Sequence, residues 1–403
     1  MTPRVTHSLM LAAALMALAA SAARGAPDAA PDRTAAPTID ADGRVSTPGA
    51  DGETVEHEAG AFVRWGAPRE SRGRWVAELA DGSRVVLYPA WTRRASVSID
   101  AERVSLRGES LLPIEAPRSA LRRLLIKAAD DTLLLDACTE RGTPSADLLW
   151  TAAGDRLEGR LAGVQERVVK FEAAGQPVEL PLAEIAALRL AGADREHDTA
   201  RLAIGLADGS LLLAAEAVLD ASGLRAKLAG GLEAASDNPE SVVFVQTLAG
   251  GFRYLSDARP VDYVQTPYST IKWPFAVDRS LTGGPLWVDG QRRTKGIACH
   301  SASRIIYKLE PNDRRFRSEA ALEDDAGPGG SVIFRVLAIR DGKFEPLFAS
   351  ETVRTGDPPI AIDVDVSGAQ GIALVADYAD YGDQSDHAAW IDARLEEGEP
   401  QSR

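Results

Sequence analysis

Apolar and polar residues alternate through much of the chain, and this period of two predicts β-strands rather than helices. Trp75–Leu79 alternates in this way, Asp81-Gly82 supplies a turn, and Arg84–Tyr88 is the next β-prone run. Two such runs around Asp-Gly are typical of a β-hairpin. The same phrase, Leu-Ala-Asp-Gly-Ser, returns at Leu206–Ser210 and indicates a second hairpin.

Region 51–235 is predicted to be β-rich with weak internal repeats. Leu112-Pro113 and Leu180-Pro181 each lead into a leucine-rich run, and the glycine turns recur with a similar period of about 70 residues. The spacing predicts a row of small, bent β-barrels or meanders of about five strands each, with the third copy truncated or diverged. It faintly resembles Sm-like or SH3-like barrels. An irregular β-rich domain with a short helix near 183–190 is the alternative.

A polar stretch, 236–242, marks a boundary, and beyond it the alternation is cleaner. Strand-like runs follow at near-regular spacing, among them Ile305–Leu309, Ser331–Leu337 and Gly371–Ala376. Many short strands separated by turn residues favour an antiparallel β-sandwich. The expected fold class is therefore all-β, with a C-terminal sandwich over 242–396 and a disordered tail, 397–403.

Residues 1–26 have the pattern of a secretory signal peptide, in which Arg4 and His7 precede an apolar run and small residues follow it. The run is shorter than the ~20 residues that a spanning helix needs, and no later segment is long and apolar enough. We therefore expect an exported protein, periplasmic or extracellular, without a membrane-spanning segment after cleavage. Residues 27–50, rich in Pro, Ala and Asp, are expected to form a disordered leader.

The composition narrows the range of functions. Lys and Arg number 45 against 59 Asp and Glu, a net charge of -14, which argues against nucleic acid as a partner. Cys138 and Cys299 are too few for a disulfide framework and are expected to be buried free thiols, with a bridge between them in an oxidising compartment as the alternative. Region 51–235 contains neither a phosphate-binding loop nor a zinc motif, so it has no chemical signature.

Several ordered motifs of the C-terminal region are similar to those of a known family. Lys295–Ser303 is close to a Lys-Gly-apolar-Gly-apolar-His-Ala-x-Ser segment, and Asp386–Leu395 resembles a closing Asp-His-x-x-Trp-x-x-Ala segment. Between them, Phe316–Asp325 and Gly329–Val336 resemble the family's central strands. The family is NPCBM, a carbohydrate-binding module associated with family 98 glycoside hydrolases. The resemblance spans roughly residues 242–396.

The resemblance implies a galactose-binding-like, jelly-roll sandwich and a carbohydrate partner, with a galactose-containing glycan as the expected class. The chain departs from the family at Ala298-Cys299, where a glycine and an aliphatic residue are usual, and at Ser301, where alanine is usual. Those side chains stay small, so the departures bear on the ligand rather than the fold. No cofactor is required, but related sandwiches often hold a structural Ca²⁺, for which Asp386 and Asp257 are the candidate ligands.

Sugar recognition needs an aromatic platform for the C–H face of the ring and planar polar groups for its hydroxyls. Loops at one end of a sandwich supply both. The candidates are the aromatic residues Trp273, Tyr381, Tyr268 and Trp287 and the polar residues Arg293, Gln384 and His387. For each aromatic residue core packing is the alternative, and for His300 and His387 the alternative is a buried structural imidazole.

These observations favour an exported, non-catalytic carbohydrate-binding protein whose region 51–235 is a scaffold or binds a protein partner. A protein–protein adaptor, on a sandwich that has lost sugar binding, is the alternative. A glycoside hydrolase is less favoured, because region 51–235 is shorter than the ~250 residues of a typical TIM barrel and does not alternate strands with helices.

Overall fold

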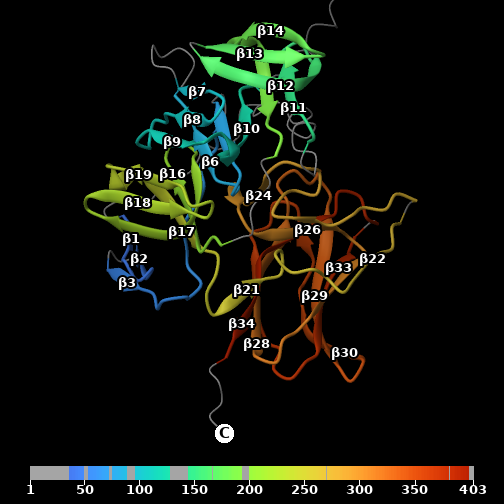
Figure 1. Cartoon of the computed structure of the whole chain (residues 1–403). Helices are drawn as coiled ribbons and strands as arrows, with labels where there is room; N and C mark the ends of the chain where they lie inside the picture. Colours follow the sequence, from blue (N-terminus) through green and yellow to red (C-terminus); the bar gives the residue numbers. More distant parts are fainter. Residues whose placement is uncertain are drawn as a thin grey trace, which may run out of the picture. The chain divides into compact units, whose positions relative to one another are not determined.

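The computed structural model describes residues 36–49, 53–71, 75–88, 96–127, 144–165, 167–192, 199–268, 270–380 and 382–398. The predicted signal peptide, Cys138, Tyr381 and the tail beyond residue 398 lie outside these ranges. The described residues form strands joined by turns and by three short 3₁₀ helices (Figure 1), so the predicted all-β class is confirmed. None of the helices in these ranges has the length and apolar character that crossing a membrane requires.

Three successive groups of strands follow one plan: a meander, a 3₁₀ helix, and a last strand that returns to pair with the first. The closing pairs are β5–β10, β11–β15 and β16–β20. In the first group, two short strands, β6 and β7, take the place of the single long second strand. The elements are β5 (Val76–Leu79), β6 (Arg84–Val86), β7 (Val97–Ile99), β8 (Arg103–Leu106), β9 (Ile114–Pro117), η1 (Arg118–Ala120), β10 (Leu121–Leu125), β11 (Asp147–Thr151), β12 (Arg156–Gln165), β13 (Val168–Ala173), β14 (Gln176–Pro181), η2 (Leu182–Glu184), β15 (Ile185–Arg189), β16 (Leu202–Leu206), β17 (Leu211–Asp220), β18 (Gly223–Leu228), β19 (Glu233–Ser236), η3 (Pro239–Ser241) and β20 (Val242–Thr247).

The third group is complete, so the expectation of a truncated third copy is wrong. The alternative of a helix near 183–190 is also wrong, because β15 is a fully buried strand and only Leu182–Glu184 is helical. That the groups are repeats in sequence stays a prediction. Strands β10 and β15 also pair with each other, with Arg123 opposite Arg189, so the first and second groups are joined edge to edge.

Residues 38–66 add four strands to the third group. Ile39 and Val45 are buried, and the tight turn at Asp40–Gly43 brings both onto the core. The prediction of a disordered leader is therefore wrong for residues 36–49. That prediction rests on the average composition of the segment, which is polar and gives no sign that Ile39 and Val45 are buried. The strands are β1 (Thr38–Ile39), β2 (Val45–Pro48), β3 (Thr54–Glu56) and β4 (Arg64–Gly66), of which β1 pairs with β17 and β4 with β20.

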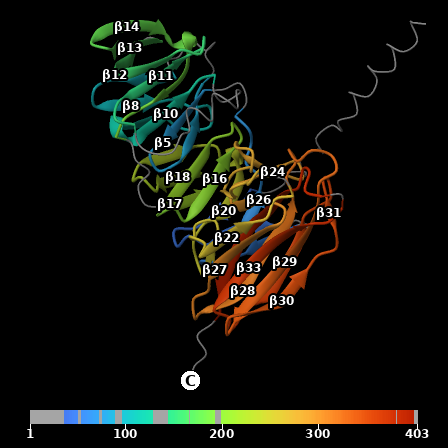
Figure 2. The same ribbon diagram turned by 90° about the vertical axis from the view of Figure 1, so that its right-hand side faces the viewer.

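The C-terminal region is an antiparallel β-sandwich, as predicted (Figure 2). One sheet has the order β23-β26-β34-β28-β32, with β21 also on β34, and the other has the order β22-β27-β33-β29-β30, with β31 on β29. Its strands, with the separate hairpin β24–β25, are β21 (Phe252–Tyr254), β22 (Asp262–Gln265), β23 (Ala276–Val277), β24 (Leu286–Val288), β25 (Gln291–Arg293), β26 (Gly296–His300), β27 (Ser303–Lys308), β28 (Asp313–Leu322), β29 (Ser331–Arg340), β30 (Lys343–Ala349), β31 (Val353–Arg354), β32 (Ile360–Asp365), β33 (Gly371–Tyr378) and β34 (His387–Glu397).

Large apolar side chains from both sheets fill the sandwich. Trp390 of β34 is fully buried, and its ring meets Phe334 of β29 edge-on with the centroids 5.1 Å apart. Phe316 and Tyr307 are buried in the same cluster. Cys299 also lies there as a buried free thiol, which confirms the prediction for this cysteine.

Strand β34 also carries a buried carboxylate. Asp392 accepts a hydrogen bond from the Gln246 amide at 2.8 Å and one from Arg64, which also donates to Glu319 at 2.6 Å. Burial raises the pKa of Asp392, and the Arg64 guanidinium opposes that rise. These contacts tie β4 and β20 to the strand that runs through the middle of one sandwich sheet.

Replacing Trp390 with alanine is expected to lower the free energy of unfolding by about 3–5 kcal/mol, because it opens a large cavity between the sheets. Trp287 on β24 is the matched control, since its side chain is only half-buried and W287A is expected to cost less. Urea titration of both variants, followed by circular dichroism, measures the difference. Equal losses would show that Trp390 does not anchor this core.

Candidate functional site

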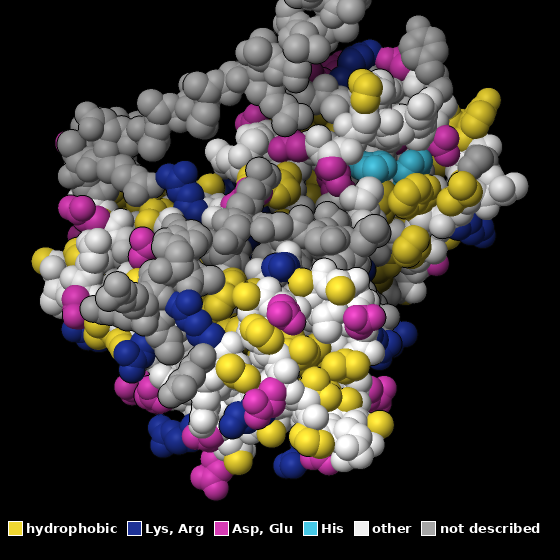
Figure 3. Space-filling view, turned by 90° about the horizontal axis from the view of Figure 1, so that it is seen from above, with side chains coloured by type: hydrophobic (Ala, Val, Ile, Leu, Met, Phe, Trp, Pro, Cys, Tyr) yellow, Lys and Arg dark blue, Asp and Glu magenta, His cyan; other side chains and the backbone are white. Residues whose placement is uncertain are grey.

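Two histidines meet where two neighbouring strands of one sandwich sheet end and begin. His300 is the last residue of β26 and His387 is the first residue of β34, and the antiparallel pairing sets them directly opposite each other. Their ring centroids are 5.9 Å apart. His300 is buried, with 5% of its surface exposed, whereas His387 is half-buried. Histidine side chains reach the surface beside hydrophobic side chains in Figure 3.

Trp273 completes this cluster from the loop between β22 and β23. Its ring stacks on His300 at 5.3 Å, with an angle of 8° between the planes, and lies 5.8 Å from the His387 ring. The backbone of Trp273 is held on both sides: its N–H donates to Gln265 Oε1 at 2.9 Å, and the Tyr263 hydroxyl donates to its carbonyl at 2.6 Å. We call Trp273, His300 and His387 the aromatic cluster.

A carboxylate faces His387 from the loop after β28. Asp325 Oδ1 lies 3.9 Å from His387 Nδ1 and accepts no proton from the ring at that distance, but its charge raises the pKa of His387 against the effect of burial. Burial also opposes ionisation of Asp325, but the neighbouring His387 ring and the donating hydroxyls of Thr282 and Ser280 hold the pKa of Asp325 below its ordinary value. For His300, burial lowers the pKa. The pKa values of the two histidines are therefore shifted in opposite directions.

Glu323 is a second carboxyl group beside the cluster. It is almost completely buried, and it accepts the Leu281 N–H at 3.0 Å. Burial raises the pKa of Glu323 to about 7. Asp325 accepts the hydroxyls of Ser280 and Thr282 at 2.8 and 2.6 Å. The two carboxyl groups thus fasten the loop 280–282 to the end of β28.

The structure brings several of the predicted residues together. Trp273 and His387 belong to the aromatic cluster. Tyr268 is 78% exposed, and its backbone N–H donates to Asp383 at 2.9 Å. This bond links the Tyr268 loop to residues 382–386, which include the exposed Gln384 and lead directly into His387. Tyr381 lies outside the described residues.

Two predicted residues are not part of this cluster. Arg293 is 7% exposed on β25 and faces Glu319 at 3.4 Å, so its guanidinium is not presented to a ligand at the surface. Trp287 is half-buried on β24; its carbonyl accepts the Asp324 N–H at 2.9 Å, and among the described residues its ring contacts no member of the aromatic cluster.

Asp325 and Glu323 are the site residues that the candidate set omits. Their sequence signal is the run Glu323-Asp324-Asp325, which by itself is typical of a solvated acidic surface. Its meaning depends on contacts with His387 and the 280–282 loop, more than forty residues away on either side.

The two carboxylates expected to bind calcium lie in different surroundings. Asp386 is buried, burial raises its pKa, and it accepts the Ser331 N–H at 2.7 Å, while Asp257 pairs with the Lys295 ammonium. Within the described ranges no three His, Cys, Asp or Glu side chains are grouped as metal ligands. Calcium binding by Asp386 or Asp257 stays a prediction.

Comparison with protein families gives one match: the NPCBM/NEW2 domain matches residues 252–396. A curated relative is alpha-1,3-galactosidase B of Akkermansia muciniphila, which is 32% identical over 120 residues. That alignment covers 29% of this chain and 14% of the galactosidase, so the chain spans only a small part of that enzyme's length.

Among solved structures, the chain is similar to CBM51-2, in complex with GlcNAc, and the INT domains of Clostridium perfringens ZmpB. The sequence identity is 26%, the alignment covers 43% of this chain and 36% of that one, and the TM-score is 0.32. It is also similar to the CBM51 of C. perfringens GH95 in complex with methyl-galactose, with 24% identity, 36% of this chain and 99% of that one covered, and a TM-score of 0.31.

Replacing Asp325 with asparagine is expected to lower the pKa of His387, because the charge that stabilises the imidazolium is removed. The raised pKa of His387 adds stability that is full below the unfolded value, about 6.5, and is lost as the pH rises through the folded value. Titration of the histidine ring signals by NMR measures the change. D257N, which removes the partner of Lys295, is the control. A His387 pKa that is the same in D325N and the wild type would contradict the assigned contact.

Proposed function

Because residues 252–396 form an NPCBM domain, a carbohydrate-binding module, we propose that this protein is an exported, non-catalytic protein that binds a glycan at the aromatic cluster. The observation that carries the proposal is Trp273, a half-exposed ring already fixed by two backbone hydrogen bonds and by stacking on His300. A galactose-containing glycan is the class that the family resemblance favours. The signal-peptide pattern of residues 1–26 supports export.

The cluster offers the two kinds of contact that a sugar needs. The indole face of Trp273 takes the C–H face of a pyranose ring, with the exposed Tyr268 as a second apolar surface nearby. His387 supplies a planar polar group. Because Asp325 lies on the Nδ1 side of the ring, it favours the proton on Nδ1 and leaves Nε2 as an acceptor for a sugar hydroxyl. Gln384, on the adjoining loop, is the second polar contact.

The carboxyl groups beside the cluster favour binding over hydrolysis. A glycoside hydrolase needs two carboxyl groups that are free to act on either side of the scissile bond. Asp325 and Glu323 instead accept hydrogen bonds from Ser280, Thr282 and Leu281. Their role in this proposal is to hold the loop and orient His387.

W273A is expected to weaken glycan binding at least tenfold, since burying a large apolar side chain is worth about 1.5–3 kcal/mol and 1.4 kcal/mol is a factor of ten. The full chain is first screened on a glycan array, with and without EDTA, and affinities for the retained glycans are then measured by calorimetry. W287A, which changes a tryptophan outside the cluster, is expected to bind like the wild type.

Three results would change this assignment. Full binding by a folded W273A would place the site elsewhere. A folded wild type that retains no glycan would favour the adaptor alternative. Loss of binding in EDTA, restored by Ca²⁺, would add calcium to the site, with Asp386 and Asp257 as the candidate ligands to mutate next.

A further inference from the structure

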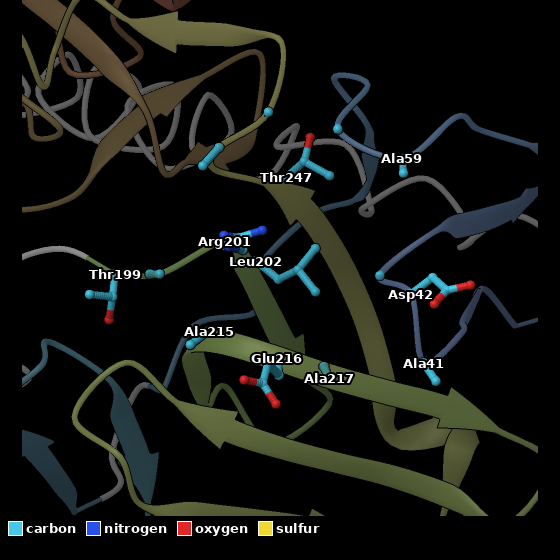
Figure 4. Close-up of a pocket in the computed structure, with 15 residues that line it drawn as sticks. Ala41, Asp42, Ala59, Thr199, Arg201, Leu202, Ala215, Glu216, Ala217 and Thr247 are labelled. Atoms are coloured by element: carbon cyan, nitrogen blue, oxygen red, sulfur yellow. The ribbon is translucent and has the colours of Figure 1, made fainter.

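The third strand group contains a hollow of about 1010 Å³ beside β17, distant in sequence from the aromatic cluster. Nine of its fifteen lining residues are alanine or glycine, so much of its wall is backbone. In Figure 4 its side chains come from separate elements: Asp42 from the turn after β1, Arg201 from the start of β16, and Glu216 from β17. None of the lining residues is aromatic, so the hollow has no platform for a sugar ring.

Part of the β17 edge has no neighbouring strand in this hollow. β16 pairs with β17 only through Leu211–Ala214, and β1 meets β17 at a single position, Ile39 opposite Leu219. Residues Ala215–Val218 lie between these two pairings. Beyond Ile39 the chain turns away at Asp40–Gly43, so β1 does not continue along this edge.

The pairing also fixes which backbone groups face the hollow. The bonds around the Asp40–Gly43 turn direct Asp40 and Thr38 toward β2, so Ile39 bonds in the other direction, toward Leu219. In an antiparallel strand, alternate residues bond to the same side. Ala217 therefore directs its N–H and C=O to the same side as Leu219, into the hollow. Among the described residues its strand pairing is with Ala226 of β18, on the other side, and no turn or loop backbone group bonds to it.

The charged side chains that line the hollow determine which extended peptides would fit it. Glu216 is engaged with Lys227 at 3.6 Å. The exposed guanidinium of Arg201 has no ion-pair partner within the described part of the chain. A guanidinium binds a carboxylate through two parallel hydrogen bonds, so Arg201 is suited to an acidic group of a bound chain.

We propose that this hollow, and in particular Ala217 and Arg201, binds an extended peptide of a partner protein. The peptide adds a short strand to the open β17 edge through the N–H and C=O of Ala217, and an acidic side chain or C-terminal carboxylate of the peptide pairs with Arg201. This strand addition gives affinity through main-chain bonds and specificity through the carboxylate. The site is independent of the glycan proposal and assigns the β-rich region a peptide-binding role.

The test is selection of phage-displayed random nonapeptides on the full chain, followed by affinity measurement with the synthesised, fluorescently labelled winners. R201A is expected to weaken binding at least tenfold. R225A is the matched control, because it removes an exposed arginine of the adjoining strand β18 that pairs with Asp237 instead of lining the hollow, and it is expected to bind unchanged.

The backbone contact is tested from both sides. A217P removes the N–H that faces the hollow, and peptides N-methylated at alternate residues lose their own donors; each change is expected to abolish binding. Methylated peptides keep this test valid if A217P does not fold. The proposal is overturned if no peptide is enriched, or if enriched peptides bind R201A like the wild type or tolerate N-methylation at every position.

Discussion

The register between β26 and β34 is the constraint on which the C-terminal domain depends. It sets Ile297 opposite Trp390 in the core and, three residues away, His300 opposite His387 at the ends of these two strands. A slip of one residue would turn Trp390 from the core toward solvent, because side chains alternate between the two faces of a strand. The geometry of the two histidines is therefore held by the burial of a tryptophan that no ligand touches.

The same strand links the site to the rest of the chain. His387 begins β34, Trp390 packs in the middle of the sandwich, and Asp392 accepts hydrogen bonds from Arg64 and Gln246 of β4 and β20. A buried carboxylate of this kind is costly to leave unpaired, so the contact requires both partners to stay in place. Six consecutive residues of one strand, 387–392, thus include a site residue, a core residue and a member of a buried ion pair.

Much of the fold could be predicted from local pattern, but the site only in part. Asp-Gly turns and alternation are local signals, and they predicted the hairpins and the sandwich strands; motif residues around His300 and His387 led to the NPCBM family. Asp325 could not be assigned to His387, since that contact joins segments more than sixty residues apart. Arg293 is predicted as a surface loop residue because Gln291–Thr294 is polar. In the folded protein it is buried and pairs with Glu319, which lies in a different part of the sequence. Ile39 and Val45 could not be predicted as core residues, because the segment around them is polar on average.

The joined strands β10 and β15 have a consequence for behaviour in a crowded compartment. The free edge of a sheet can recruit a strand from another molecule, and this is a common start of aggregation. The pairing of β10 with β15, in which Leu124 lies opposite Leu188, joins the edge strand of one group to the edge strand of the other. Each strand then covers an apolar edge that could otherwise pair with another molecule. Separating the first two groups, by truncation or proteolysis between them, would expose both edges at once and favour self-association.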